Sequence, residues 1–428
     1  MCRRFNSVLG HQFPRTQRAK IQAAIAFGSP QSVGHLSSAL SHEHDVAAVG
    51  AGVAGLACAL GLSQQGLRIA LIGPRARLHQ PAPATPFDVR IYAVAPATVE
   101  LLEKLAVWKR IDPLRVCPIE RMRVFGDRGD ELTFDAYTAA VDRLATIVEE
   151  SDLLRVLDAA CDFQPGIARL ESAFDGLTAN DETAIVRLDD AAEFSTRLVI
   201  GADGAQSAVR AAAGRGVTVT DYQQSAVVCN FVCTTPHLNT AWQWFTDEGV
   251  VALLPLPGEH VSLVWSAPTA LAQQLAALDA AELAQRVTER TGAALGELTP
   301  AGVAQTFPLR LIVVDRLIGN RVALVGDAAH VVHPLAGQGL NLGLQDVAAL
   351  LELVRAREPF RDIGDSVLLR RYERSRAEPI AMMRAATDGL VRLFGVDDPL
   401  ARFVRNTGMA AVDRVSPLKN LLIRQALG

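Results

Sequence analysis

The stretch DVAAVGAGVAGLACALGLSQQGLRIALIG, residues 45–73, predicts a strand, a tight turn, a helix and a second strand. The short apolar run 46–49 fits a buried strand, and the apolar run after the turn continues to about residue 65. Gly66 stands where a helix C-cap favours glycine. The apolar residues 67–72 then predict the second strand, so the segment has the order of a β-α-β unit.

Three glycines in the turn have the spacing GxGxxG. Gly50 permits a tight turn, Gly52 lets the backbone approach a pyrophosphate, and Gly55 lets helix and strand pack closely. The first turn of the helix would then face the phosphates with its positive dipole end. A glycine-rich structural turn is the alternative, but a strand before the motif and a helix after it favour dinucleotide binding.

The end of the second strand departs from the usual dinucleotide site. An acidic residue is expected there to bind the hydroxyls of the adenosine ribose. This chain has Gly73, followed by Pro74 and Arg75. Either another group binds the ribose, or Arg75 binds a 2′-phosphate as in sites for NADP.

Composition and charge exclude several classes of protein. The chain has 428 residues, enough for two or more domains, and its 50% hydrophobic and 21% charged residues are typical of a globular protein. A net charge of −4 without a dominant basic patch argues against nucleic acid as a partner. No apolar run approaches the roughly 18 residues of a transmembrane helix. The 6 cysteines form no CxxC pair, so we expect buried apolar side chains rather than a metal or redox site.

Residues 1–43 differ from the rest of the chain. They hold five basic side chains against one acid and are rich in Ser and Gln. An organellar transit peptide has this composition, and it would predict a protein of the mitochondrial matrix. No clear amphipathic helix carries the arginines, which favours a disordered extension or a misassigned start codon, and a cytoplasmic protein.

The remaining sequence changes character along its length. Residues 196–204 (TRLVIGADG) and 321–326 (RVALVG) are further apolar strands, whereas 222–266 hold short β-rich runs typical of an antiparallel sheet. Helices are expected at 96–109, 144–160 and 269–294, and from about 338 onward. The predicted class is α/β (α+β), with a Rossmann-like domain, an inserted antiparallel sheet and C-terminal helices. The expected organisation is a basic extension at 1–43, a discontinuous nucleotide-binding domain at 44–116, 140–215 and 305–360, a substrate domain at 117–139 and 216–304, and a helical region at 361–428.

Two acids follow predicted strands. Asp203 in GADG is by itself typical of a turn, whereas Asp327 in VGDAAH lies between Gly326 and Ala328, where a ligand chain can reach its carboxylate. A ribitol hydroxyl is a natural donor to that carboxylate. Glycines at 337, 339 and 343 then allow outward-pointing amides at a helix start. The positive end of that helix would stabilise the negative charge of a reduced isoalloxazine ring.

Three segments together resemble a known family. Residues 45–55, 201–210 and 321–346 are similar to the three FAD motifs of class A flavoprotein aromatic hydroxylases. HPLAGQGLNLGLQD at 333–346 resembles the signature of the ubiquinone-biosynthesis hydroxylases in particular. DVRIYAVAPATVELLEKLAVW at 88–108 and the sheet segment at 241–268 resemble the same family, and the similarity covers nearly all of 45–428.

The resemblance implies a set of FAD-binding residues. The motif glycines would bind the pyrophosphate, Asp203 would belong to the motif shared by FAD and the reductant, and Asp327 would bind the ribitol. An arginine would lie near the flavin, and the helix start would line its pyrimidine edge. The full set is Gly50, Gly52, Gly55, Arg90, Asp203, Gly326, Asp327, Gly337, Gln338, Gly339, Leu340 and Asn341.

Two histidines stand beside this motif. His330 and His333 have no carboxylate partner at an obvious spacing and no third metal ligand nearby. We therefore expect structural hydrogen bonds at the helix start rather than catalysis or metal binding, and the sequence singles out no catalytic side chain.

The resemblance implies an FAD-dependent monooxygenase that uses NADPH or NADH and dioxygen. It would hydroxylate the ring of a polyprenylated phenol in ubiquinone biosynthesis through a flavin C4a-hydroperoxide. Two alternatives are a flavin hydroxylase of a small soluble aromatic and a non-catalytic subunit of a quinone-synthesis complex, which Gly73 favours. Apolar residues near the C-terminus, such as Leu390 and Phe394, either form a peripheral membrane face or pack against other helices, and we favour packing.

Overall fold

The computed structural model describes residues 43–75, 87–126, 131–332 and 338–395. The predicted basic extension, the part of the predicted helical region after residue 395, His333 and Gly337 lie outside these ranges. The fold below therefore concerns the unit that begins at residue 42.

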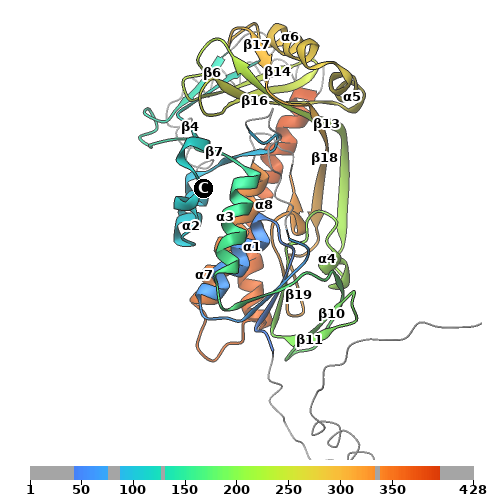
Figure 1. The fold of residues 1–428 in the computed structure, drawn as a ribbon. Coiled ribbons are helices and arrows are strands. Elements are labelled where there is room, and N and C mark those ends of the chain that lie inside the picture. The colour runs from blue at the N-terminus through green and yellow to red at the C-terminus, as the bar shows by residue number, and fades with distance from the viewer. Residues whose placement is uncertain (1–42, 76–86, 127–130, 333–337, 396–428) are drawn as a thin grey trace, which may run out of the picture. The chain divides into compact units, whose positions relative to one another are not determined.

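The β-α-β unit predicted from residues 45–73 belongs to a mainly parallel sheet of six strands within the described residues (Figure 1). Its first two strands pair in parallel, and so do the strands next to them. The four central strands are fully buried, which explains their continuous apolar runs. In spatial order the strands are β19 (Ile318–Gly319), β20 (Val322–Leu324), β12 (Leu198–Gly201), β1 (Val46–Val49), β2 (Ile69–Ile72) and β8 (Ile167–Leu170).

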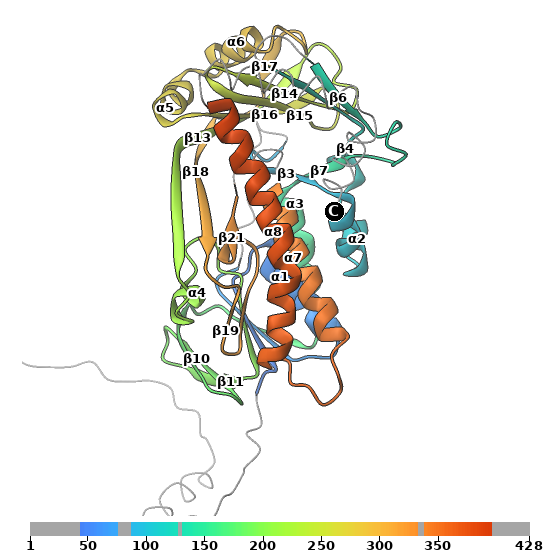
Figure 2. The ribbon, with the colours of Figure 1, turned by 180° about the vertical axis from the view of Figure 1, so that it is seen from behind.

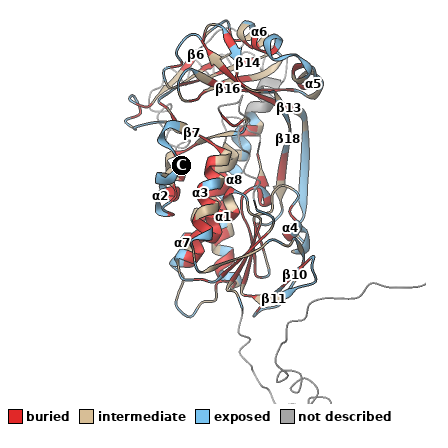
Figure 3. Cartoon of the chain, viewed as in Figure 1, coloured by how far each residue is buried: buried red, intermediate tan, exposed pale blue. Residues whose placement is uncertain are grey.

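Helices from distant parts of the sequence pack around α1. α1 contacts α3 and α7, and α7 in turn contacts α8 (Figure 2). Buried residues run along α1 and α7, as the colouring of Figure 3 shows. These helices are α1 (Val53–Gln64), α2 (Pro96–Lys104), α3 (Glu150–Asp162), α4 (Ala208–Ala212), α7 (Gln338–Arg355) and α8 (Ser366–Gly395).

A second, larger sheet has nine strands in the described chain. Its pairings are antiparallel except for that of β14 with β5, and α5 (Thr269–Ala277) and α6 (Ala280–Arg290) pack on one of its faces. Its strands are β21 (His330–Val331), β18 (Gln305–Val314), β13 (Val217–Cys233), β16 (His260–Pro268), β15 (Gly249–Pro255), β14 (Thr240–Thr246), β5 (Arg121–Phe125) and β6 (Glu131–Asp135), with β17 (Leu298–Pro300) beside β13.

Two three-stranded sheets and three short 3-10 turns complete the described chain. One sheet is β3 (Ile91–Val94), β7 (Ala145–Glu149) and β4 (Cys117–Ile119), and the other is β11 (Glu193–Thr196), β10 (Ala184–Leu188) and β9 (Phe174–Ala179). The turns are η1 (Trp108–Arg110), η2 (Pro113–Arg115) and η3 (Gly326–Ala328).

The predicted α/β class with an inserted antiparallel sheet is confirmed, whereas some element limits are wrong. The helix predicted at 144–160 begins only at Glu150, because the β-branched residues before it pair with both neighbours in the β3-β7-β4 sheet. The helix predicted at 96–109 ends at Lys104. The helix predicted at 269–294 is two helices, since the capping box of Asp279 and Glu282 starts a new one. The domain limits stay a prediction, and the limit at 305 is the first residue of β18.

Candidate active site

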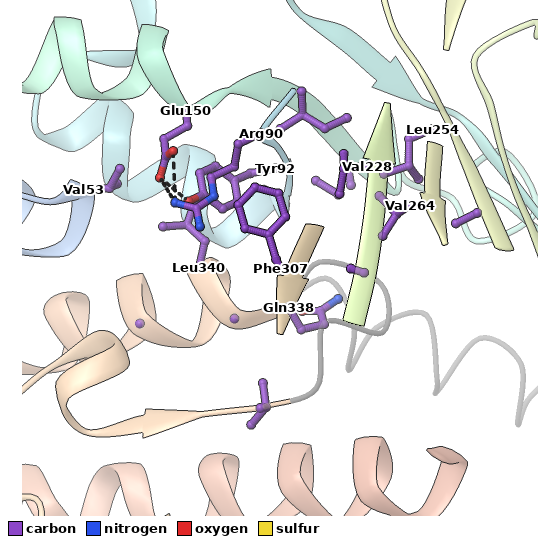
Figure 4. Close-up of a pocket in the computed structure, with 18 of the residues that line it drawn as sticks. Val53, Arg90, Tyr92, Glu150, Val228, Leu254, Val264, Phe307, Gln338 and Leu340 are labelled. Atoms are coloured by element: carbon purple, nitrogen blue, oxygen red, sulfur yellow. Dashed lines mark hydrogen bonds and ion pairs between the residues drawn. The ribbon is translucent and has the colours of Figure 1, made fainter. Parts of the chain in front are cut away.

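A cavity of about 620 Å³ collects the predicted motifs. It is lined by the glycine turn before α1, by β3, by η3, by the start of α7, and by the face of the nine-stranded sheet that α5 and α6 do not cover. Figure 4 shows Arg90 and Glu150 on one side of this cavity and the apolar sheet residues Val228, Leu254 and Val264 on the other. The cavity therefore has a polar end beside the nucleotide-binding motifs and an apolar wall.

The three glycines of GxGxxG have three different reasons to be glycine. Gly50 has a φ of +110°, and a Cβ there would lie 2.2 Å from the carbonyl oxygen of Ala202. A Cβ on Gly55 would lie 1.9 Å from the carbonyl oxygen of Gly50, so helix and turn are in direct backbone contact. A Cβ on Gly52 would meet no atom within 4 Å, and Gly52 lines the cavity. Gly50 and Gly55 are therefore required by the fold, whereas Gly52 leaves room for a ligand at the start of α1.

Asp327 lies in the cavity on the η3 turn. Gly326 before it has a φ of +61°, and a Cβ on Gly343 of α7 would lie 2.9 Å from the Gly326 Cα, so the turn and the helix touch. Burial raises the pKa of Asp327, although the nearby charges of His330 and Arg90 oppose that shift. The side chain of Asp327 is exposed to the cavity, so its carboxylate can accept hydrogen bonds from the hydroxyls of a ligand.

The start of α7 gives a mixed result for the predicted flavin edge. Gln338, Gly339 and Leu340 line the cavity as expected. Asn341 is buried and is not among the lining residues. Its Oδ1 accepts hydrogen bonds from Ala95 N (2.8 Å) and Thr98 Oγ1 (2.9 Å), and its Nδ2 donates to the Ala93 carbonyl. Asn341 thus fixes the start of α7 against β3 and α2.

Arg90 lines the cavity with 53% of its side chain exposed, and two residues that were not predicted, Tyr92 and Glu150, accompany it. Its guanidinium donates to Glu150 at 3.1 Å and lies 5.1 Å above the ring of Phe307. The hydroxyl of Tyr92 donates to the same carboxylate at 2.7 Å. Burial and the carboxylate together raise the pKa of Tyr92, so the phenol stays neutral. Glu150 was not predicted as a site residue because it follows β7 (Ala145–Glu149), a strand in a segment that we expected to be helical.

Asp203 and Arg210 of the second motif form hydrogen bonds with other groups of the protein. Asp203 accepts hydrogen bonds from Ser207 Oγ (2.5 Å) and Val209 N (3.1 Å) at the start of α4, whereas its neighbours Ala202 and Gly204 line the cavity. The buried Arg210 donates to the carbonyl oxygen of Ala328 at 3.0 Å. The second motif is therefore tied to the turn that carries Asp327.

The expectation that His330 lacks a carboxylate partner is wrong. Its Nε2 lies 2.6 Å from Oδ2 of the fully buried Asp346, and that oxygen also accepts from Gly326 N at 3.0 Å. The other carboxylate oxygen accepts from Arg376 Nε of α8 at 2.7 Å. We call Asp346, His330 and Arg376 the Asp346 cluster. It joins η3, β21, α7 and α8 directly behind the cavity, and this supports the structural role expected for His330.

The backbone conformation after β2 explains why residue 73 is a glycine. Gly73 has a φ of +128°, a conformation that an acidic residue rarely adopts. Arg75 donates to Asp162 at 2.9 Å and to Glu171 at 3.2 Å. Because Asp158, Asp162 and Glu171 all form ion pairs with Arg75, the interpretation of Arg75 as the residue that binds a 2′-phosphate loses support.

The described residues give no support to metal binding or to cysteine chemistry. Within them, no cluster of His, Cys, Asp and Glu has the geometry to hold a metal ion. The described cysteines are all buried, and burial raises the pKa of Cys58 to about 12, so its thiol is inert. A search of the same residues finds no helix long and apolar enough to span a membrane.

Comparison with known proteins identifies the family. The sequence model of the FAD binding domain matches residues 43–387. The 3-demethoxyubiquinol 3-hydroxylase of Escherichia coli is 35% identical over 386 residues, which cover 90% of this chain and 98% of that protein. Ubiquinone hydroxylase UbiL of Rhodospirillum rubrum is also 35% identical, over 94% of each chain. The chain belongs to the FAD-dependent ubiquinone-biosynthesis hydroxylase family.

Solved structures agree with the fold of this hydroxylase family. PqsL of Pseudomonas aeruginosa has a TM-score of 0.71 at 22% identity, covering 85% of this chain and 99% of its own. HpxO of Klebsiella pneumoniae, complexed with FAD and uric acid, has a TM-score of 0.69 at 19% identity, over 89% and 97% of the two chains. Identities at this level support the fold alone.

The cofactor of this hydroxylase family is FAD, and the residues of the cavity fit it. Gly52 leaves open space at the N-terminus of α1, where a pyrophosphate is favoured. Asp327 offers a carboxylate to a ribitol, and the N-terminal turn of α7 borders the same cavity. The predicted family, cofactor and enzyme class are thus confirmed.

Proposed function

We propose that the protein hydroxylates the aromatic ring of a polyprenylated phenol in ubiquinone biosynthesis, with dioxygen and with NADPH or NADH as reductant. The observation that carries the proposal is the form of the cavity, in which the flavin-binding end continues into an apolar wall on the nine-stranded sheet. The relatives named for ubiquinone hydroxylation support it, since they match nearly their full length.

FAD supplies the electron transfer and the activation of oxygen when it is bound. We propose that Gly52 and the start of α1 hold its pyrophosphate and that Asp327 accepts from its ribitol. The α7 start, from Gln338 to Leu340, would place its dipole at the flavin ring. Arg90 and Glu150 stand beside this end of the cavity, where they order its polar wall.

The apolar wall would receive the substrate and exclude water. Ala226 and Val228 of β13 and Val264 of β16 present aliphatic side chains to the cavity, and none of them can bind a carboxylate. These residues favour a neutral, apolar part of the substrate, because the cations that line the cavity, Arg90 and Arg310, lie at the flavin end and on β18.

The proposal extends to organisation and place. We propose the discontinuous FAD-binding domain and the separate substrate domain with the limits given by the sequence. We propose a cytoplasmic protein that reaches its lipid substrate by peripheral contact with the inner membrane or within a quinone-biosynthesis complex. A transit peptide in residues 1–43 would place the same chemistry in the mitochondrial matrix.

The test is direct. The purified protein is checked for bound FAD by its visible spectrum, supplied with NADPH or NADH, and offered a polyprenyl phenol in detergent. We expect oxygen consumption and a product heavier by one oxygen atom in mass spectrometry. Hydroxylation confined to soluble hydroxybenzoates would replace the proposal with the small-aromatic alternative. A folded chain that binds no FAD would support a non-catalytic subunit.

A further inference from the structure

We propose that the prenyl tail of the substrate lies in an apolar arm of the cavity that crosses the nine-stranded sheet and opens at its β6 edge. This inference rests on the proposed function, which it deepens by locating the tail. We call this part of the cavity the tail arm and define it by six lining residues, Val264, Ala252, Leu254, Ala241, Met122 and Phe134.

The strand register places these residues in one row. Val264 of β16 pairs with Ala252 of β15, Ala241 of β14 pairs with Met122 of β5, and Met122 pairs with Phe134 of β6. Directly paired residues share a face of a sheet, as do residues two apart in one strand. The row therefore faces the cavity on each strand, while the alternate residues Val251, Leu253 and Trp265 are buried beneath α5 and α6.

The row continues from the flavin end without interruption. Val228 of β13 pairs with Val264, and Ala226 pairs with Phe307 of β18, above which Arg90 lies. From β18 to β6 there are six strand spacings of about 4.8 Å, or roughly 29 Å. An aromatic ring beside the flavin would occupy only the first part of this length. The remaining length suits a long chain attached to the ring.

The charge distribution separates the two ends. Among the described residues that line the cavity, the charged ones are Arg90, Glu150, Arg310 and Asp327, and all belong to the flavin end or to β18. The tail arm contains none of them, and Gln243 is the polar amide beside it. Ile119 and Leu144 line the cavity on the side of the small β3-β7-β4 sheet, so apolar atoms surround the arm from both sheets.

The outer end of the arm is open. Met122, Phe134 and Leu144 are only half-buried although they are apolar and line the cavity. Tyr137, shortly after β6, is 93% exposed. Contiguous apolar side chains that stay half-exposed beside a cavity mark a place where an apolar ligand enters or leaves. A prenyl chain would cover them and emerge here, toward the lipid in which quinone precursors dissolve.

A pair of variants on β6 tests this route. Phe134→Glu places a carboxylate in the arm, and Thr133→Glu places the same charge on the opposite face of the same strand. The KM for a phenol with an octaprenyl chain and for the same phenol without a chain is measured for each protein, with hydroxylated product quantified. Phe134→Glu is expected to raise the KM for the octaprenyl phenol by about tenfold or more, because the charge must be desolvated beside the chain.

The expected pattern is selective. The KM for the chain-free phenol stays unchanged in Phe134→Glu, and Thr133→Glu changes neither KM. An equal change for both phenols, no change in Phe134→Glu, or an equal effect of Thr133→Glu would overturn the tail route. If Phe134→Glu fails to retain FAD, Leu254→Trp, which fills the arm with a neutral side chain, decides by the same selectivity. A wild-type protein that hydroxylates neither phenol would instead refute the proposed function.

Discussion

Removal of the Asp346 carboxylate should lower the free energy of unfolding and should also weaken the binding of FAD. Asp346 is fully buried and accepts from three groups, namely His330, Gly326 N and Arg376. Asp346→Ala deletes all three interactions and leaves the buried guanidinium of Arg376 with only two long hydrogen bonds of 3.3 Å. Among the residues that the structure describes, no carboxylate other than Asp346 forms an ion pair with Arg376.

The magnitude follows from that burial. Removing one partner of a buried ion pair costs about 3–5 kcal/mol, because the other charge stays buried and uncompensated. Replacing both partners by apolar side chains of similar volume is often nearly neutral. Asp346→Leu combined with Arg376→Met should therefore be more stable than Asp346→Ala. Some loss should remain, since Gly326 N–H and His330 still lack their acceptor, at about 1–3 kcal/mol for a buried donor.

The assay uses protein freed of FAD, because a bound ligand would add its own stabilisation by mass action. Unfolding in urea is followed for the wild type, for the single variants Asp346→Ala, Asp346→Leu and Arg376→Met, and for the double variant of Asp346→Leu and Arg376→Met. FAD affinity is then measured by quenching of flavin fluorescence. We expect weaker FAD binding in the single Asp346 variant, because Gly326 loses the bond that holds the turn of Asp327.

Two results would refute this reasoning. One is an Asp346→Ala variant that unfolds within about 1 kcal/mol of the wild type, since that is the range of exposed ion pairs. The other is strict additivity, in which the double variant loses as much stability as the two single variants together. Additivity would mean that Asp346 and Arg376 do not interact energetically despite their distance of 2.7 Å.

Three further predictions follow from the same site. Gly55→Ala should destabilise the FAD-free protein by about 1–3 kcal/mol through overpacking, whereas Gly52→Ala should leave its unfolding midpoint unchanged and weaken FAD binding about tenfold, as titration would show. Burial raises the pKa of Asp327, so its negative charge lowers the stability of the fold above that pKa and has no effect on stability at low pH. Asp327→Asn should therefore have a higher midpoint of urea unfolding than the wild type at neutral pH and the same midpoint at acidic pH, and it should bind FAD more weakly. Burial alone would raise the pKa of Asp362, but its interactions with Arg321 and Arg197 outweigh burial and lower that pKa. The charged Asp362 therefore stabilises the fold until the pH falls through the lowered pKa. Arg321→Met should move the midpoint of acid unfolding, followed by circular dichroism, to a higher pH.

The local parts of the fold were predictable from the sequence. The turn at Gly50–Gly55 and the helix after it depend on residues close in the chain, and the predicted end near residue 65 is one residue from the observed one. Apolar runs predicted the four central strands of the six-stranded sheet, because those strands are fully buried, whereas the less buried outer strands β8 and β19 were not predicted. The family resemblance then brought distant motifs to one cofactor, and the cavity contains residues from each of them.

The unpredicted features depend on contacts between distant segments. β7 forms because β3 and β4 lie on either side of it, and no periodicity in residues 145–149 announces these neighbours. The partner of His330 is sixteen residues away on α7, and Arg376 comes from α8. Asn341 bonds to β3 instead of lining the cavity, since the packing of α7 against β3 and α2 decides where its amide points. Sequence spacing alone carries no information on such packing.

The glycines that the fold does not need are the strongest internal argument for a bound cofactor. Gly52 and Gly339 have φ angles that any residue adopts, and a Cβ on either would meet no atom within 4 Å. Gly339 is the second residue of α7, at the end of the helix that borders the cavity. No contact within the fold therefore requires glycine at either position, and both line the cavity. Gly73 is the opposite case, because its φ of +128° makes glycine a requirement of the turn. The feature that favoured a non-catalytic subunit thus has a structural cause, while the glycines without one stand where FAD would bind.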